Sequence, residues 1–165
     1  MDLFDRIMEL SRHGYFCGQI LAILLMETLG EENVGFVRAM GGLNGGVGFS
    51  GDVCGCCTGG ACVISYLTGK GEDTGMDHPE HKSAMGEFTR WFEEEMMVNY
   101  GGIDCRDITK GNPANRVELC PASSPIPMQN AWKSSRKRDS SDDHKQNQLA
   151  YRKTGGTRGH SPRVP

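Results

Sequence analysis

A largely buried helix is predicted by residues 15–30, YFCGQILAILLMETLG. Apolar side chains occupy more than one helical stripe over this stretch, whereas a surface helix carries only one such stripe. The pattern ends at Gly30, and glycine is the residue most often found just beyond a helix. This helix is therefore expected to lie in the core of the protein.

Further helical patterns lie on both sides of this stretch. A short amphipathic helix should open the chain and end near Gly14, and Asn33 should cap another short helix. Longer helices are predicted over residues 54–68 and from Pro79 to about Tyr100. The second is expected to start at Pro79 because proline is favoured at a first helical position. No stretch of useful length has the pattern of a strand. The sequence therefore predicts an all-α fold, a small bundle of about four main helices.

A glycine-rich loop, GGLNGGVGFSG, is expected to connect two of these helices over residues 41–51. Six of its eleven residues are glycine, which allows positive φ angles and close approach of the backbone. Gly55 and Gly59 lie four residues apart in the next predicted helix, so they would let another backbone come close on that face.

The composition of the chain changes after Cys120. Residues 1–120 contain nine Lys and Arg against 18 Asp and Glu, a net charge of −9. Residues 121–165 contain nine Lys and Arg against three Asp, a net charge of +6, and only 20% of them are apolar. Such a stretch cannot bury enough apolar area to offset an ordering entropy of about 1–2 kcal/mol per residue. We therefore predict a cysteine-containing helical domain over residues 1–120 and a basic, low-complexity, disordered tail over residues 121–165.

The same features exclude several classes of protein. No apolar run approaches the roughly 20 residues that cross a bilayer, and the acidic, amphipathic N-terminus differs from a secretory signal. The seven cysteines make up about 4% of the chain, fewer than disulfide scaffolds contain. We therefore expect a cytoplasmic protein whose odd-numbered, clustered cysteines serve metal or redox chemistry. The basic residues of the tail are too few to indicate a nucleic-acid partner: Lys133, Arg136, Lys137 and Arg138.

Cys54 and Cys57 form a CxxC pair at the start of a predicted helix. At a helix start, unpaired backbone amides and the positive end of the helix dipole favour a thiolate, the form that attacks disulfides and binds soft metals. Cys62 fits a small buried apolar residue, and Cys17 by its neighbours alone fits the core. Cys56 fits packing and chemistry equally well.

Cys105 and Cys120 lie near predicted chain breaks, where a packing role and a ligand role are equally open. They complete an order of cysteines that begins with Cys17-Gly-Gln-Ile and continues with Cys54-Gly-Cys-Cys-Thr-Gly59. Over about residues 1–122 this order resembles the C-GCAxxG-C-C family, a group of small bacterial proteins that is named for its cysteines and regarded as redox-active.

The resemblance places the four family cysteines on Cys17, Cys54, Cys105 and Cys120, and the motif glycines on Gly55 and Gly59. Cys56 then stands where the family usually has alanine, and Cys57 and Cys62 fall outside the four. The resemblance also implies an accessory role, with components of an oxidoreductase or a transporter as partners. It implies a further helix after Cys120, where this chain has a basic, serine-rich stretch.

Three functions remain open from the sequence. In the first, the four family cysteines meet at one end of the bundle and carry out thiol–disulfide or electron-transfer chemistry, with Cys54 as the activated thiolate and another of the four as the resolving thiol. In the second, the cofactor is a zinc ion or an iron–sulfur cluster, bound by Cys17, Cys54, Cys105 and Cys120. In the third, the cysteines only pack within a non-catalytic helical scaffold.

Overall fold

The computed structural model describes residues 2–120 and 126–136, and the regular structure in these ranges is helical. The helices are α1 (Leu3–Arg12), α2 (Cys17–Leu29), α3 (Val34–Met40), α4 (Gly55–Thr68), α5 (His81–Tyr100), α6 (Cys105–Ile108), α7 (Arg116–Leu119) and α8 (Ile126–Arg136), with two short 3-10 helices, η1 (Gly41–Leu43) and η2 (Pro113–Asn115). β-type pairing within these ranges is limited to an isolated bridge between Val53 and Asp104. The prediction of an all-α fold is confirmed. No helix in the same ranges is long and apolar enough to cross a bilayer.

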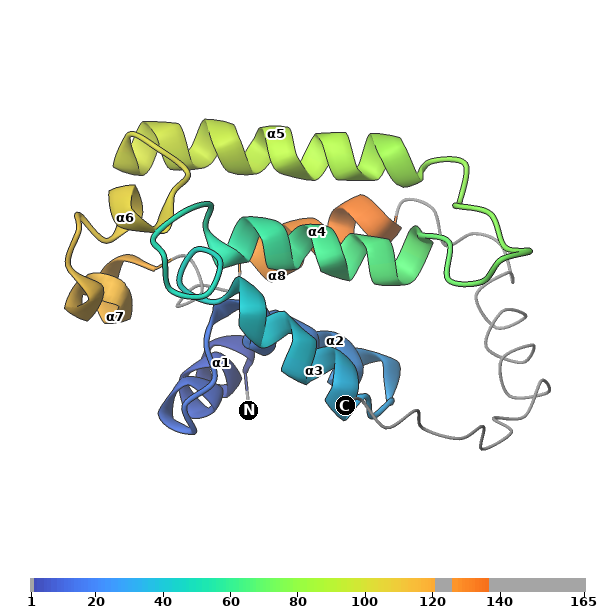
Figure 1. Cartoon of the computed structure of the whole chain (residues 1–165), viewed down its shortest axis with the longest axis horizontal. Coiled ribbons are helices and arrows are strands. Elements are labelled where there is room, and N and C mark those ends of the chain that lie inside the picture. Colours follow the sequence, from blue (N-terminus) through green and yellow to red (C-terminus); the bar gives the residue numbers. More distant parts are fainter. Residues whose placement is uncertain (1, 121–125, 137–165) are drawn as a thin grey trace, which may run out of the picture.

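α4 lies at the centre of the bundle (Figure 1). It packs against α2, α5 and α8, which come from three different parts of the chain. The core between them contains Leu25 of α2, Val63 and Ile64 of α4, and Phe88 and Phe92 of α5, all of them almost completely buried. Burying an apolar side chain of this size contributes about 1.5–3 kcal/mol. The contacts of α4 with its neighbours therefore hold the fold together.

α2 is the largely buried helix that the sequence predicts. Eight of its thirteen residues are buried, and it ends at Gly30, which adopts the left-handed conformation with φ at 66°. α3 follows after Asn33, whose side-chain oxygen accepts a hydrogen bond from the N–H of Phe36 at 2.9 Å. Both predicted helix boundaries are confirmed, because each depends on a local hydrogen bond or backbone conformation that the residue type itself favours.

α5 begins later than predicted, since Pro79 lies outside the helix, which starts at His81. The segment before α5 is instead tied to the end of α4. The N–H of His78 donates to the carbonyl oxygen of Thr68 at 2.8 Å, and the side-chain oxygen of Thr68 lies 2.7 Å from Nδ1 of His81. These hydrogen bonds hold the segment in a turn, so the helix begins only after it.

Glycines allow the backbones of α2 and α4 to come into contact. A Cβ atom on Gly59 would lie 3.3 Å from the Cα atom of Gly18, and a Cβ atom on Gly18 would lie 2.6 Å from the carbonyl oxygen of Met40. A Cβ atom on Gly55 would lie 2.6 Å from the carbonyl oxygen of Leu43. A side chain at Gly18 or Gly55 would force the backbone to move, whereas one at Gly59 would require its neighbours to shift by a few tenths of an ångström. The prediction that another backbone approaches this face of α4 is confirmed.

α8 extends the packed part of the chain beyond the predicted domain boundary at residue 120. It packs against α4 and α5, lies behind α4 in Figure 1, and contains the completely buried Ala131. The low apolar content of residues 121–165 is an average that conceals this short helix, whose first turn contains Pro127. The further helix implied by the family resemblance is thus present. The prediction of disorder for residues 137–165 lies outside the described residues.

Candidate functional site

An antiparallel backbone bridge brings two cysteine-bearing segments together. The N–H of Cys54 donates to the carbonyl oxygen of Ile103 at 3.0 Å, and the N–H of Cys105 donates to that of Asp52 at 2.7 Å. The guanidinium group of Arg106 also forms an ion pair with the Asp52 carboxylate. The start of α4, where Cys54 lies, is therefore held beside the start of α6, where Cys105 lies.

Cys17 is the first residue of α2 and reaches the start of α4 from another side. Its Sγ atom lies against the backbone of Gly55, where an added Cβ atom would overlap it. Asn44 of the glycine-rich loop joins this contact, because its Oδ1 atom lies 4.0 Å from Cys17 Sγ and accepts a hydrogen bond from the N–H of Gly18 at 3.0 Å. Asn44 is 3% exposed and also donates to the side chain of Gln19 at 3.0 Å. The loop and the start of α2 are thereby held together around Cys17.

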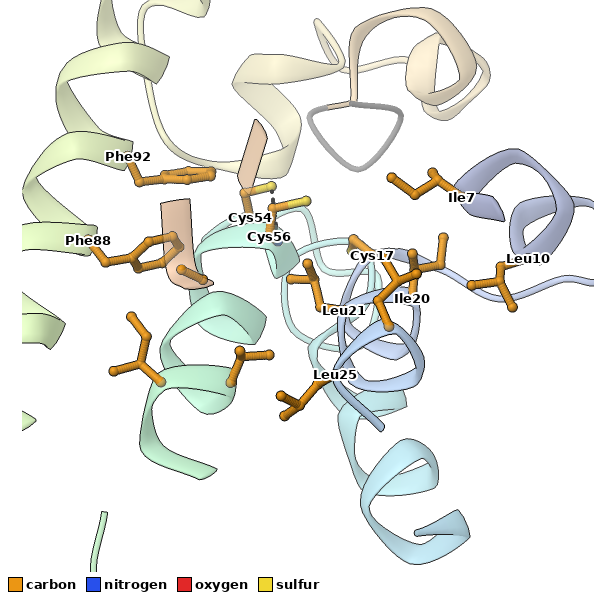
Figure 2. Packing of buried hydrophobic residues seen from close by; sticks show 14 of the residues in the cluster. Ile7, Leu10, Cys17, Ile20, Leu21, Leu25, Cys54, Cys56, Phe88 and Phe92 are labelled. Carbon is orange, nitrogen blue, oxygen red and sulfur yellow. Dashed lines mark hydrogen bonds between the residues drawn. The ribbon is translucent and has the colours of Figure 1, made fainter. Parts of the chain in front are cut away.

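Cys56 lies at the centre of the cysteines. It is completely buried in the first turn of α4, and the thiols of Cys17, Cys54 and Cys120 lie close enough to it to shift its pKa. Its backbone N–H donates to Cys54 Sγ at 3.5 Å, so Cys54 caps the helix. Figure 2 shows Cys54 and Cys56 between the aromatic rings of α5 on one side and Cys17 on the other. We call Cys17, Cys54, Cys56, Cys105 and Cys120 the cysteine cluster.

The hydrogen bonds distinguish a thiolate from a thiol within the cluster. The hydrogen bond from Cys56 lowers the pKa of Cys17 to about 6, with help from backbone N–H groups, that of Gly45 first, and against the effect of burial. The hydrogen bonds of Cys56 itself, that to Cys120 first, raise the pKa of Cys56 well above the ordinary range of a thiol, and burial adds to this. With a pKa of about 6, Cys17 is largely a thiolate at neutral pH, and Cys56 is the main cause of this.

A cationic and a phenolic side chain border the cluster. Burial and the nearby Cys54 raise the pKa of Cys105, whereas the guanidinium group of Arg116, which hydrogen-bonds to Cys105, acts in the opposite direction. Burial and the neighbouring thiols also raise the pKa of Tyr100. Arg116 therefore places a positive charge beside the thiols, a feature that stabilises thiolates.

Two cysteines lie outside the cluster. Burial, with contributions from Cys54 and Glu93, raises the pKa of Cys57 to about 11, so its thiol stays protonated at neutral pH. Cys62, two helical turns beyond the start of α4, is partly buried, and burial raises its pKa. The CxxC pair that the sequence suggested therefore does not provide two reactive thiols.

The structure brings together all four cysteines that the sequence singled out. Cys54 is the N-cap of α4 rather than a residue of its first turn, and the cysteine whose pKa is lowered is Cys17. Sequence analysis left Cys56 undecided, although its place in the first turn of the same helix was visible. It missed Asn44 and Arg116, for which the sequence contains no signal beyond residue type.

The seven cysteines form no disulfide with one another in this structure. Across residues 2–120 and 126–136, no group of three or more His, Cys, Asp or Glu side chains is arranged to hold a metal ion. The hypothesis that Cys17, Cys54, Cys105 and Cys120 bind zinc or an iron–sulfur cluster therefore gains no support from the geometry.

Buried thiols that meet at one end of a helical bundle, one of them as a thiolate, define a helical protein with a cysteine-based site. The chain belongs to the family described as "Putative redox-active protein (C_GCAxxG_C_C)", whose model matches residues 15–139. No curated protein and no solved structure matches the chain.

The GCAxxG part of the family pattern fits residues 55–60 when its cysteine is placed on Cys56. Cys57 then stands at the alanine of the pattern, and the glycines are the first and last residues of this range. This alignment differs from the predicted one, in which the cysteine of the pattern fell on Cys54 and not on Cys56. Cys54 becomes an additional cysteine beside the four of the pattern.

Both glycines of this alignment have a structural reason. A Cβ atom on Gly55 would overlap Cys17 Sγ, and a Cβ atom on Gly60 would overlap the ring of Phe88. The first glycine therefore allows two cysteines of the pattern to meet, and the second allows α5 to pack against α4.

Proposed function

We propose that this protein carries out thiol–disulfide exchange, and that Cys17 and Cys56 form and break the disulfide bond. The proposal rests on the contact of Cys17 Sγ with Gly55, the neighbour of Cys56 in the chain, and on the effect of Cys56 on the pKa of Cys17. Two thiols that lie close enough for one to shift the pKa of the other are placed to form an S–S bond, whose length is about 2.05 Å. The description of the family as redox-active supports the same kind of chemistry.

Cys17 is suited to be the attacking sulfur. A thiolate is the nucleophile in thiol–disulfide exchange, and the best attacking thiol has a pKa near the ambient pH, because a still lower pKa reduces nucleophilicity. The pKa of Cys17, lowered to about 6 mainly by the Cys56 hydrogen bond, meets both conditions.

In the proposed reaction, the Cys17 thiolate and the Cys56 thiol give two electrons to a disulfide of the substrate; Cys56 supplies one proton and water supplies the other. One S–S bond forms between the two cysteines, and the S–S bond of the substrate breaks to leave two thiols. The reverse reaction oxidises a substrate dithiol. A component of an oxidoreductase or a transporter, the partner that the resemblance implies, would supply or accept the electrons.

Oxidised glutathione added to the reduced full-length chain tests this proposal. After the remaining thiols are blocked and the chain is digested, mass spectrometry should detect two peptides joined through Cys17 and Cys56. The matched control Cys62→Ser should give the same linkage, because Cys62 lies outside the cluster, and Cys56→Ser should abolish it. The proposal is wrong if the chain at equilibrium forms no disulfide between Cys17 and Cys56.

A further inference from the structure

The thiols of the proposed disulfide are shielded from solvent. Cys17 is 7% exposed and Cys56 is 0% exposed, and Cys54 and Cys105 are buried to a similar degree. In exchange, the attacking sulfur must contact a sulfur atom of the substrate directly. A peptide disulfide or a glutathione disulfide cannot enter a close-packed interior. A more exposed thiol must therefore make the first contact with such a substrate.

Three cysteines are only partly buried, and their surroundings differ. Cys57 is poorly suited because burial raises its pKa to about 11, which leaves almost no thiolate at neutral pH. Cys62 lies two helical turns along α4 from the cluster. Cys120 is the one of the three that forms a hydrogen bond with the thiol of Cys56. It therefore combines access to solvent with contact to the buried pair.

The position of Cys120 also favours exchange. It follows α7 directly, and its N–H donates to the carbonyl oxygen of Arg116 at 3.2 Å. Figure 1 shows α6 and α7 together at one end of the molecule, where α4 begins. The guanidinium group of Arg116 lies beside Cys105 of the same cluster, so a positive charge that stabilises thiolates is present within the cluster.

From this arrangement we infer that Cys120 is the entry thiol of the site, which exchanges with the external disulfide and passes the oxidation on to Cys56 and Cys17. The inference rests on the proposed function and adds to it a route between the surface and the buried pair. Cys56 can serve as the intermediate because its thiol contacts both Cys17 and Cys120.

The route has three exchange steps. The Cys120 thiolate attacks the substrate disulfide, forms a mixed disulfide and releases one substrate thiolate, which takes a proton from water. The sulfur of Cys56 then attacks that of Cys120, and the second substrate sulfur leaves with the proton of Cys56. Finally the Cys17 thiolate attacks Cys56, which forms the Cys17–Cys56 disulfide and regenerates the Cys120 thiolate. In sum, one substrate disulfide becomes two thiols.

Two oxidants of different size test the inference on the full-length chain. Oxidised glutathione should require the entry thiol, whereas hydrogen peroxide is small enough to reach Cys17 and convert it to a sulfenic acid. Cys56 then displaces the oxygen as water to form the same disulfide. In Cys120→Ser the rate of Cys17–Cys56 formation with oxidised glutathione should fall about tenfold or more relative to the rate with peroxide, because only the glutathione route passes through Cys120. The control Cys62→Ser should match the wild type with both oxidants.

A trapping experiment gives a second, independent readout. In Cys56→Ser the second step is blocked, so glutathione should accumulate on Cys120 as a mixed disulfide that mass spectrometry can locate. The inference is overturned if Cys120→Ser reacts with oxidised glutathione at the wild-type rate, or if the trapped glutathione is found on Cys17 or Cys57. If neither oxidant produces a Cys17–Cys56 disulfide in the wild type, the proposed function itself fails.

Discussion

Replacing Cys56 by alanine should change Cys17 from a mostly ionised thiol into one that is at least half protonated at neutral pH. The hydrogen bond from Cys56 is the largest cause of the lowered pKa of Cys17, and alanine cannot donate one. Serine at the same position keeps a hydrogen-bond donor, its hydroxyl group. The pair Cys56→Ala and Cys56→Ser therefore separates the loss of the hydrogen bond from the loss of the sulfur atom.

The size of the effect follows from the strength of such a hydrogen bond. A hydrogen bond to a charged group contributes about 1.5–3 kcal/mol, and about 1.4 kcal/mol corresponds to a tenfold change in ionisation. The pKa of Cys17 should therefore rise from about 6 to between about 7 and 8 in Cys56→Ala. In Cys56→Ser it should stay close to the wild-type value.

The ultraviolet absorbance of the thiolate, followed over pH, measures this change. Subtracting the curve of the same protein with Cys17→Ser isolates the titration of Cys17 from those of the other cysteines. The account of the cluster would be refuted if Cys56→Ala titrated like the wild type, because another group would then stabilise the thiolate. An equal rise in the alanine and serine variants would also refute it, since the donated hydrogen bond would not be the cause.

Three further predictions concern the stability of the fold. Because the pKa of Cys17 is about 6 in the folded chain and about 8.5 for an ordinary thiol, the folded state binds fewer protons between these values, and its stability should fall as the pH drops through about 6. Urea unfolding at about pH 5.5 and about pH 7.5 should show a gain of about 2 kcal/mol in the wild type that Cys17→Ala lacks, and equal gains would contradict this. Gly55→Ala should lower the free energy of unfolding by about 1–3 kcal/mol, because its Cβ atom would overlap Cys17 Sγ. Gly86→Ala lies in open space on α5 and should raise the free energy of unfolding by up to about 1 kcal/mol. If the melting temperatures of both variants moved in the same direction, the close contact at Gly55 would be contradicted. Ala131→Asp should lower the free energy of unfolding by about 3 kcal/mol or more, because it buries a charge between α8 and its neighbours. Gln129→Asp, at an exposed position of the same helix, should change the stability little. Similar losses of stability in the two variants would mean that α8 does not pack as described.

The sequence was sufficient to predict the helices whose boundaries depend on local residues. Gly30 and Asn33 end and begin helices through their own backbone conformation or side-chain hydrogen bond, and both were found from the pattern. Pro79 failed as a marker because the end of α4 holds the preceding segment in a turn, a tertiary contact that no local pattern contains. The family resemblance implied α8 but the composition did not, because the polar composition of a long segment conceals a short helix that is stabilised by packing of Ala131.

The sequence partly predicted which cysteines belong to the site, but it did not predict the role of each cysteine within it. The apolar residues around Cys17 in the sequence favoured a place in the core, whereas the family resemblance placed Cys17 in the site. The structure brings Cys17 to the other cysteines. The roles within the site depend on which thiol donates to which, and this is decided by helices that meet from different parts of the chain. The central position of Cys56 follows from the start of α4 lying against Cys17 on one side and Cys120 on another.

The carbon-13 chemical shifts of the cysteine Cβ atoms test the central claim most directly, because these shifts distinguish a thiol from a disulfide at each residue. As the reduced chain is titrated with oxidised glutathione, the resonances of Cys17 and Cys56 should move to disulfide values together, with one midpoint, while that of Cys62 stays in place. Separate midpoints for Cys17 and Cys56, or a change at Cys62 without either of them, would contradict the account.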